Sequence, residues 1–271
     1  RVEVDRCPAL TAPLGALPAK LAGMLALVLR DLEEVHVLES EGAVAVSLHL
    51  AAGVRERHQR AGAALITGAG VQGGGLVPKK GAPELLGQPE LGERAGTWLR
   101  PDAFAQANAQ VNEALVAAAA EAVGPGALLE LYSGNGNFTL AVAARAASVL
   151  AVESAAVSLE LAREAVRKRG VQNVRFVLGD AAKVSRGLVK EGQRFEGLLV
   201  DPPRGGAVGV AEWAAGLHVA RVVYVACDPA ALARDAGELL RRGFWPASLR
   251  LFDLFPQTRH VEALMVFETR G

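Results

Sequence analysis

The chain has 271 residues, of which 51% are hydrophobic, and its 29 basic residues balance its 29 acidic residues. This length can bury a sizeable core in one large domain with a smaller one beside it. The zero net charge excludes a global electrostatic attraction to polyanions, although local basic clusters can still supply a nucleic-acid surface.

The sequence contains neither a membrane segment nor a cysteine framework. No apolar run reaches the roughly 18 residues that a membrane-spanning helix needs, and residues 1–5 lack the apolar core of a signal peptide. We therefore expect a cytoplasmic protein that binds no membrane. Cys7 and Cys227 are the only cysteines, which is too few for a disulfide framework or an all-cysteine metal site. We expect no metal. The absence of an initiator Met suggests a processed or truncated chain.

The first part of the chain gives a mixed pattern of elements. Apolar residues between 14 and 31 recur at helical spacing, and residues 35–38 and 43–50 are predicted to form a hairpin joined at Glu41-Gly42. The glycines between 68 and 75 have no strand and helix around them, so they indicate a loop or short strand rather than a phosphate cradle. Residues 102–122 are predicted to be helical, with Asp102 as the N-cap.

After Gly124 the pattern changes to regular alternation of strands and helices. This alternation predicts a doubly wound parallel sheet. The last two strand-like runs, 248–255 and 261–268, follow each other without a helix, so we expect them to pair antiparallel. The fold class is therefore α/β. By analogy at the level of the fold, we expect the plan of a Rossmann-like class I methyltransferase domain, with a smaller N-terminal α+β subdomain. The five parallel strands are expected at 127–132, 148–153, 174–178, 197–201 and 222–227.

Three strand ends predict a cofactor site. The loop that includes Gly134 and Asn137 follows the first strand and opens a helix, so its backbone can approach a ligand closely. It is not G-x-G-x-x-G, which favours a small adenosyl ligand over a dinucleotide. Glu153 ends the second strand and can accept hydrogen bonds from ribose hydroxyls, and Asp180 ends the third strand and can accept from an adenine amino group. Together they predict S-adenosylmethionine, although a tight turn, a surface Glu and a helix N-cap would explain each one separately.

The last strands carry a thiol and a carboxylate, Cys227 and Glu262. A thiol that adds to an electron-poor ring and a carboxylate that later removes a proton are the groups needed to alkylate a pyrimidine carbon that is not itself nucleophilic. Asp201 ends the fourth strand and can accept a hydrogen bond from a ring imide N–H. Arg204 indicates a structural ion pair or a phosphate contact. The alternative for Cys227 is an ordinary buried strand cysteine.

Five motifs in order over about residues 98–271 give the chain a family resemblance. It resembles the RNA 5-methyluridine methyltransferases. The motifs are Phe104-Ala105-Gln106-Ala107-Asn108, Glu130-Leu131-Tyr132-Ser133-Gly134-Asn135-Gly136-Asn137-Phe138, Asp201-Pro202-Pro203-Arg204-Gly205, Cys227-Asp228-Pro229-Ala230-Ala231-Leu232-Ala233-Arg234-Asp235 and Asp253-Leu254-Phe255-Pro256-Gln257-Thr258-Arg259-His260-Val261-Glu262.

The resemblance implies roles for individual residues. Cys227 is the expected nucleophile and Glu262 the expected general base. Gln106 and Asp201 are expected to contact uracil or cofactor, and the S-adenosylmethionine site is expected to be lined by Gln106, Tyr132, Glu153 and Asp201. The implied reaction is methyl transfer to carbon 5 of a uridine in ribosomal or transfer RNA. Because that carbon cannot reach such a pocket from inside a duplex, the uridine must be single-stranded or flipped out.

The chain also departs from the family pattern, since the small N-terminal RNA-binding barrel and the four iron-sulfur cysteines of many members are missing. We expect residues 1–97 to form a substrate-facing subdomain with the hairpin, and residues 98–271 to form the catalytic domain of a monomer. Two rival functions stay open: a cytosine-5 RNA methyltransferase, whose N3-directed Glu motif we do not find, and a non-catalytic RNA-binding module.

Overall fold

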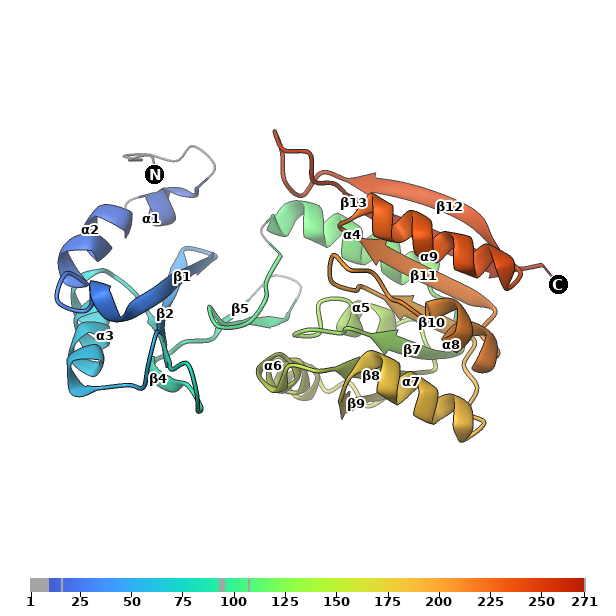
Figure 1. Cartoon of the computed structure of the whole chain (residues 1–271), viewed down its shortest axis with the longest axis horizontal. Coiled ribbons are helices and arrows are strands. Elements are labelled where there is room, and N and C mark those ends of the chain that lie inside the picture. Colours follow the sequence, from blue (N-terminus) through green and yellow to red (C-terminus); the bar gives the residue numbers. More distant parts are fainter. Residues whose placement is uncertain (1–9, 16, 93–95, 107, 271) are drawn as a thin grey trace. The chain divides into compact units, whose positions relative to one another are not determined.

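Figure 1 shows the computed structural model, which describes residues 10–15, 17–92, 96–106 and 108–270. The chain divides into two compact units. The N-terminal unit is Arg1–Arg94 with Trp98–Ala105, and the C-terminal unit is Ala95–Thr97 with Gln106–Gly271. Ala107, which belongs to the first of the five motifs, and Cys7 lie outside the described residues. The roles expected for the two parts of the chain remain predictions.

The described residues of the N-terminal unit form a four-stranded sheet in the order β1-β2-β3-β4 and a separate two-stranded sheet of β5 and β6. Strand β3 runs parallel to β2, and the other pairs are antiparallel. The elements are α1 (Ala12–Gly15), α2 (Leu17–Met24), η1 (Leu29–Asp31), β1 (Leu32–Ser40), β2 (Ala43–Leu50), α3 (Glu56–Gly68), β3 (Gly73–Val77), β4 (Glu84–Gly87), β5 (Leu91–Gly92) and β6 (Trp98–Leu99).

The predicted hairpin is confirmed, and its turn has a simple cause. Glu41 and Gly42 both have left-handed backbone angles, with φ of 52° and 86°, which is the geometry of a tight two-residue turn that suits twisted strands. The Glu39 carboxylate accepts a hydrogen bond from the Gly42 N–H at 2.7 Å. The hairpin then packs its β2 side chains into a core shared with α2 and α3.

Asp102 does not cap a helix, so this prediction is wrong. The Arg100 guanidinium donates two hydrogen bonds of 2.6 Å to the Asp102 carboxylate, and both side chains are almost fully buried. A buried carboxylate needs such a charged partner. Helix α4 (Ala109–Ala122) starts at Asn108 instead, whose side-chain oxygen accepts from the Val111 N–H at 3.2 Å.

The C-terminal unit is built on one large sheet, which the described residues form from seven strands in the order β12-β13-β11-β10-β7-β8-β9. Strands β7 to β11 are parallel, and β12 and β13 are antiparallel. The strands are β7 (Ala127–Leu131), β8 (Ser148–Glu153), β9 (Val174–Leu178), β10 (Gly197–Val200), β11 (Arg221–Ala226), β12 (Phe244–Phe252) and β13 (Glu262–Thr269). The helices after α4 are α5 (Thr139–Ala143), α6 (Ala156–Lys168), α7 (Ala181–Lys190), α8 (Val210–Gly216) and α9 (Pro229–Arg241).

The α/β plan predicted from the sequence is confirmed. The ends of the five parallel strands agree with the predicted ones to within one residue, and the last two strands pair antiparallel. Two apolar layers enclose the sheet: α4 and α5 pack on one face, and α7, α8 and α9 pack on the other (Figure 1). No helix in the described part of the chain combines the length and the apolar character that crossing a bilayer requires.

Gly74 explains why a glycine run forms strand β3. It pairs with Val46 of β2, and a Cβ built on Gly74 would lie 1.7 Å from the Val46 carbonyl oxygen. A side chain at this position would therefore push the two strands apart.

Gly74→Ala is expected to destabilise the N-terminal unit by about 2 kcal/mol or more. Hydrogen exchange followed by mass spectrometry should show faster exchange in β2 and β3 and no change in β7 to β13. Gly53→Ala is the control, because a Cβ there meets nothing within 4 Å. Unchanged exchange in β2 and β3 of Gly74→Ala would show that the strands tolerate the methyl group.

Candidate active site

Four ionisable side chains lie on the face of the large sheet that α4 and α5 cover. Side chains two positions apart on a strand point to the same face. Each of the four lies two positions from a residue of the apolar core on that face, namely Leu128, Leu199, Val225 or Leu264. Three of them, contributed by the ends of β10 and β11 and by the start of β13, meet at one edge of the sheet. The four are Glu130, Asp201, Cys227 and Glu262.

The strand register brings Cys227 and Glu262 together. Ala226 at the end of β11 is opposite Ala263 of β13. Since these strands are antiparallel, the next opposing residues are Cys227 and Glu262. The sequence predicted both as catalytic residues. Each comes directly after the last β11–β13 pair, Ala226 with Ala263, and the Glu262 charge acts on the Cys227 thiol.

The surroundings of Cys227 keep its thiol protonated. The side chain is half-buried. Burial raises the pKa of this thiol, and the nearby carboxylates of Glu262 and Asp201 raise it further, while the Arg204 guanidinium lowers it. The thiol is therefore not a preformed thiolate at neutral pH, and it must lose its proton as a substrate enters.

The two carboxyl groups near the thiol also hold protons more tightly than usual. Burial, and then the charge of Glu262, raises the pKa of Asp201 to about 7. Glu262 is 4% exposed, and burial raises its pKa as well. Carboxyl groups that share a poorly solvated site resist simultaneous ionisation. A carboxylate with a raised pKa is a stronger base, which suits a group that removes a proton near neutral pH.

Glu130 is a buried acid to which the sequence reasoning assigned no role. It is 1% exposed, and neither carboxyl oxygen has a hydrogen-bond partner among the described residues. Burial raises its pKa to about 8; the nearby Thr139 hydroxyl lowers it and the charge of Asp201 raises it. Glu130 is thus mostly protonated at neutral pH. The signal in the sequence was one acidic residue inside the apolar run 127–131.

The loop after β7 is held in an unusual backbone conformation. Tyr132, Gly134 and Gly136 all have left-handed angles, with φ of 62°, 57° and 87°. A Cβ on Gly136 would lie 3.2 Å from the Ala162 side chain of α6, whereas a Cβ on Gly134 would meet nothing within 4 Å. Gly136 is therefore required for packing, and Gly134 leaves open space beside the backbone.

Glu153 anchors this loop to the end of β8. One of its oxygens accepts from the Gly134 N–H at 2.9 Å, and the other accepts from the N–H groups of Ser154 and Ala155 at 2.7 Å each. The oxygen that binds Gly134 keeps a second lone pair for a ligand. The predicted ribose contact stays a prediction, and it would use that lone pair.

The remaining predicted cofactor residues have structural partners of their own. Asp180 is exposed and caps α7, where its carboxylate accepts from the Lys183 N–H at 2.9 Å. Its charge contributes, after burial, to the raised pKa of Tyr132, so these two side chains are near each other. Asn137 exchanges two amide hydrogen bonds, of 2.8 and 3.1 Å, with the buried Asn112 of α4. The sequence reasoning missed Asn112, which had no motif to mark it.

Gln106 and Arg204 complete the set of predicted residues. Gln106 is half-buried and lies just before the N-cap of α4. Arg204 is exposed on the segment between β10 and α8, and its charge lowers the pKa of both Cys227 and Asp228. Arg204 therefore lies near the thiol. In the described part of the chain, no group of three or more His, Cys, Asp or Glu side chains is arranged to hold a metal ion.

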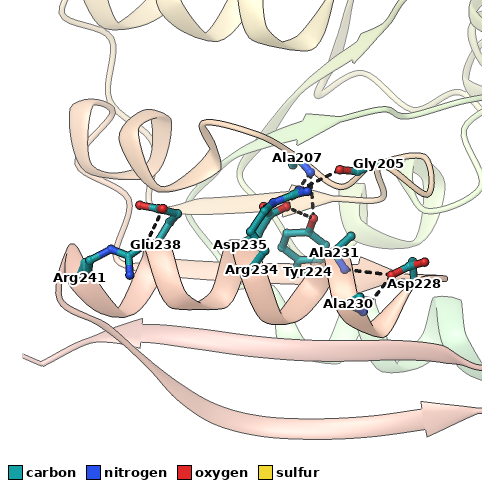
Figure 2. Close-up of polar contacts among 10 residues, drawn as sticks. All are labelled: Gly205, Ala207, Tyr224, Asp228, Ala230, Ala231, Arg234, Asp235, Glu238 and Arg241. Carbon is teal, nitrogen blue, oxygen red and sulfur yellow. Dashed lines mark hydrogen bonds and ion pairs between the residues drawn. The ribbon is translucent and has the colours of Figure 1, made fainter.

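Helix α9 begins directly behind the thiol. The Asp228 carboxylate caps it by accepting from the N–H groups of Ala230 and Ala231 at 2.8 and 2.9 Å, as Figure 2 shows, and Pro229 occupies the first turn. The N-terminal end of a helix favours negative charge. A thiolate formed at Cys227 would be stabilised by this helix end.

Glu130 predicts a specific pH dependence of stability. Its pKa rises from an ordinary value of 4.5 to about 8 on folding, so the folded protein binds this proton more tightly than the unfolded chain does. Stability that depends on the proton is complete below about pH 4.5 and is lost as the pH rises towards about 8. Glu130→Gln should remove this loss. Between about pH 4.5 and 8, the free energy of unfolding of the parent should therefore decrease by about 2 to 4 kcal/mol more than that of Glu130→Gln.

Urea unfolding at several pH values measures this difference. Glu160→Gln, at an exposed position of α6, is the control and should follow the parent. Parallel curves for the parent and Glu130→Gln would contradict the raised pKa.

Comparison with known proteins places the C-terminal unit in a family. Residues 97–270 match the family model described as tRNA (Uracil-5-)-methyltransferase. The chain is 41% identical over 187 residues to the 23S rRNA (uracil(1939)-C(5))-methyltransferase RlmD of Pseudomonas aeruginosa, a match that covers 66% of this chain and 42% of that protein. The protein of the same name from Pseudomonas entomophila is 37% identical over 282 residues, covering 98% of this chain and 61% of the relative.

Two solved structures share the fold. The tRNA (uracil-54, C5)-methyltransferase of Pyrococcus abyssi, in complex with S-adenosyl-L-homocysteine, has a TM-score of 0.76 and 21% identity, covering 98% of this chain and 70% of that one. The tRNA m1G37 methyltransferase of M. jannaschii has a TM-score of 0.55 and 11% identity, covering 87% and 75%. These likenesses confirm the class I methyltransferase fold. Because the family model spans more than half of the chain, the protein belongs to the tRNA (uracil-5-)-methyltransferase family.

Proposed function

We propose that this protein is an enzyme that transfers a methyl group from S-adenosylmethionine to carbon 5 of a uridine in RNA. The observation that carries the proposal is that Cys227 and Glu262 directly follow the last pair of β11 and β13, Ala226 with Ala263, and that the Glu262 charge acts on the thiol. Family membership supports the same reaction. The chain spans about two fifths of the P. aeruginosa relative, so the activity of the whole protein is part of this proposal.

The residues around the loop after β7 fit S-adenosylmethionine. Open space lies beside the left-handed Gly134, and the Ser133 hydroxyl is 2% exposed without a hydrogen-bond partner among the described residues. A buried polar atom of this kind is normally paired, and a bound ligand would supply the pairing. We propose that Tyr132, Glu153 and Asp180 contact the cofactor here, and that Gln106 and Asn137 border the same site. When bound, S-adenosylmethionine would supply an electrophilic methyl group.

Cys227 would activate the pyrimidine. Its sulfur forms a bond to carbon 6, and the electron pair of the 5,6 double bond moves towards the carbonyl oxygen at carbon 4. The resulting enolate makes carbon 5 nucleophilic, so that it can take up the methyl group. The thiol proton passes to solvent, which the half-buried side chain can reach, as the bond forms. The helix N-terminus at Asp228 and the Arg204 charge both favour its departure.

Glu262 would complete the reaction by removing the proton that remains on carbon 5. Loss of that proton restores the 5,6 double bond and expels the sulfur of Cys227 as a thiolate, which frees the methylated uridine from the enzyme. The burial of Glu262 raises its pKa and so makes its carboxylate a better base. Asp201 would accept the N3–H of the uracil ring, which selects uridine over cytidine.

The substrate is proposed to be ribosomal or transfer RNA, in which the target uridine is single-stranded or flipped out of its stack. The named relatives act on 23S rRNA and on tRNA. We further propose that residues 98–271 form the catalytic domain and residues 1–97 face the substrate, and that the enzyme works as a cytoplasmic monomer. Arg204, exposed beside the thiol, would contact an RNA phosphate.

Cys227→Ala is expected to reduce methyl transfer by about a thousandfold or more, because carbon 5 cannot become nucleophilic without the sulfur adduct. Binding of S-adenosylmethionine, measured by calorimetry, should persist. Transfer is measured as labelled methyl incorporated into RNA from cells that lack the protein, followed by nucleoside analysis, with Cys7→Ser as the matched cysteine control.

The product decides between the candidate functions. Labelled 5-methyluridine that disappears only in Cys227→Ala supports the proposal. Labelled 5-methylcytidine would instead identify a cytosine-5 methyltransferase, and RNA binding without any labelled product would identify a binding module. Retained 5-methyluridine formation by Cys227→Ala would refute the assigned nucleophile.

A further inference from the structure

A buried hydrogen-bond network joins strand β11, helix α9 and the segment after β10. Tyr224 of β11 is fully buried, and its hydroxyl donates to the Asp235 carboxylate of α9 at 2.6 Å. The Ala207 N–H donates to the same carboxylate oxygen at 2.7 Å and to the Tyr224 oxygen at 3.0 Å. Figure 2 shows these three groups converging on one another.

Arg234 extends this network to the backbone beside Ala207. Its Nε donates to the second oxygen of Asp235 at 2.9 Å, and its Nη2 donates to the Gly205 carbonyl at 2.8 Å (Figure 2). Gly206 lies directly against these groups: it has a φ of 76°, and a Cβ there would be 2.5 Å from Arg234 Nη2 and 2.6 Å from Asp235. The hydrogen bonds and these close contacts therefore hold the backbone of residues 205–207 in one position.

The network lies between the two segments that carry the candidate catalytic groups. Arg204 immediately precedes Gly205, and Cys227 follows Tyr224 on the same strand end. Asp235 belongs to the helix whose N-terminus lies behind Cys227. A displacement of residues 205–207 would move Arg204 away from the thiol without touching Cys227 itself.

Stability alone is a weak reason for such a network. Asp235 is 2% exposed, and a buried carboxylate costs more desolvation energy than an apolar residue of similar size. Every polar group is paired: the carboxylate accepts from Tyr224, Ala207 and Arg234. Fully satisfied buried networks of this kind fix one conformation of the chain.

We propose that Tyr224 and Asp235 are positioning residues that hold the segment 202–207 so that Arg204 stays beside Cys227. This inference rests on the proposed role of Cys227 in the methyl transfer. The two residues touch neither substrate nor cofactor in this account; they act through the backbone of Gly205 to Ala207. The Arg204 charge lowers the pKa of the thiol, so a movement of Arg204 can be detected as a change in the pKa of Cys227.

The test measures the alkylation rate of Cys227 by iodoacetamide as a function of pH, in the full chain with Cys7→Ser and without cofactor or RNA. Tyr224→Phe removes only a hydroxyl group and should raise the apparent pKa of the thiol, with an alkylation rate at neutral pH lower by about threefold. Arg204→Gln should give a similar shift. In the Arg204→Gln background, Tyr224→Phe should have no further effect, since both act through one guanidinium.

Two further variants separate positioning from other effects. Asp235→Asn removes a negative charge, which by itself would lower the thiol pKa, so a raised pKa identifies displacement of the segment. Arg234→Lys keeps the positive charge but cannot make the forked bonds to Asp235 and Gly205 at this half-exposed position, and it serves if the core variants do not fold. Glu238→Gln, which loses an exposed ion pair with Arg241 on the same helix, is the matched control and should leave the profile unchanged.

An unchanged thiol pKa in a folded Tyr224→Phe or Arg234→Lys protein would overturn the proposal. Equal shifts with and without Arg204 would overturn it too, because Tyr224 would then act by another route. Neither result depends on methyl transfer, so a failure here is distinguishable from a failure of the proposed function.

Discussion

The antiparallel pairing of β11 with β13 is the constraint on which the site depends. The parallel strands all end on one side of the sheet, and an antiparallel neighbour must begin on that same side. Ala226 pairs with Ala263, so Cys227 and Glu262 are the next residues beyond this pair. A slip of β13 by one residue would turn the Glu262 side chain to the other face of the sheet, away from Cys227. The pair of groups is thus a consequence of the topology as much as of the motifs.

Burial gives these groups their chemistry. Asp201, Glu262 and Cys227 all bind protons more tightly than in water, chiefly because the sheet edge is poorly solvated. The thiol is held protonated, and the carboxylate is made more basic. These properties suit a reaction in which the thiolate and the basic carboxylate form only when a substrate enters. The positive charge of Arg204 and the N-terminus of α9 oppose this effect at the sulfur. In the proposal above, the network around Tyr224 and Asp235 holds Arg204 in this position.

The sequence predicted the parts of the structure that follow from local pattern. Strand and helix alternation located the parallel strands, and the absence of a helix before β13 predicted the antiparallel pair. It could not reveal which partner a polar side chain chooses across the fold. Asp102 pairs with Arg100 instead of capping a helix, Asn137 pairs with Asn112, and three backbone N–H groups bind Glu153. The roles predicted for the site residues remain predictions.

The central claim is that the sulfur of Cys227 forms a bond to carbon 6 of a uridine. RNA that contains 5-fluorouridine tests this directly, since fluorine replaces the proton that Glu262 would remove and so stops the release of the enzyme. Incubation with S-adenosylmethionine, protease digestion and mass spectrometry should find a methylated fluorouridine nucleotide attached to the peptide that contains Cys227. Methylated fluorouridine RNA that is free of protein, or an adduct on a different residue, would contradict the account.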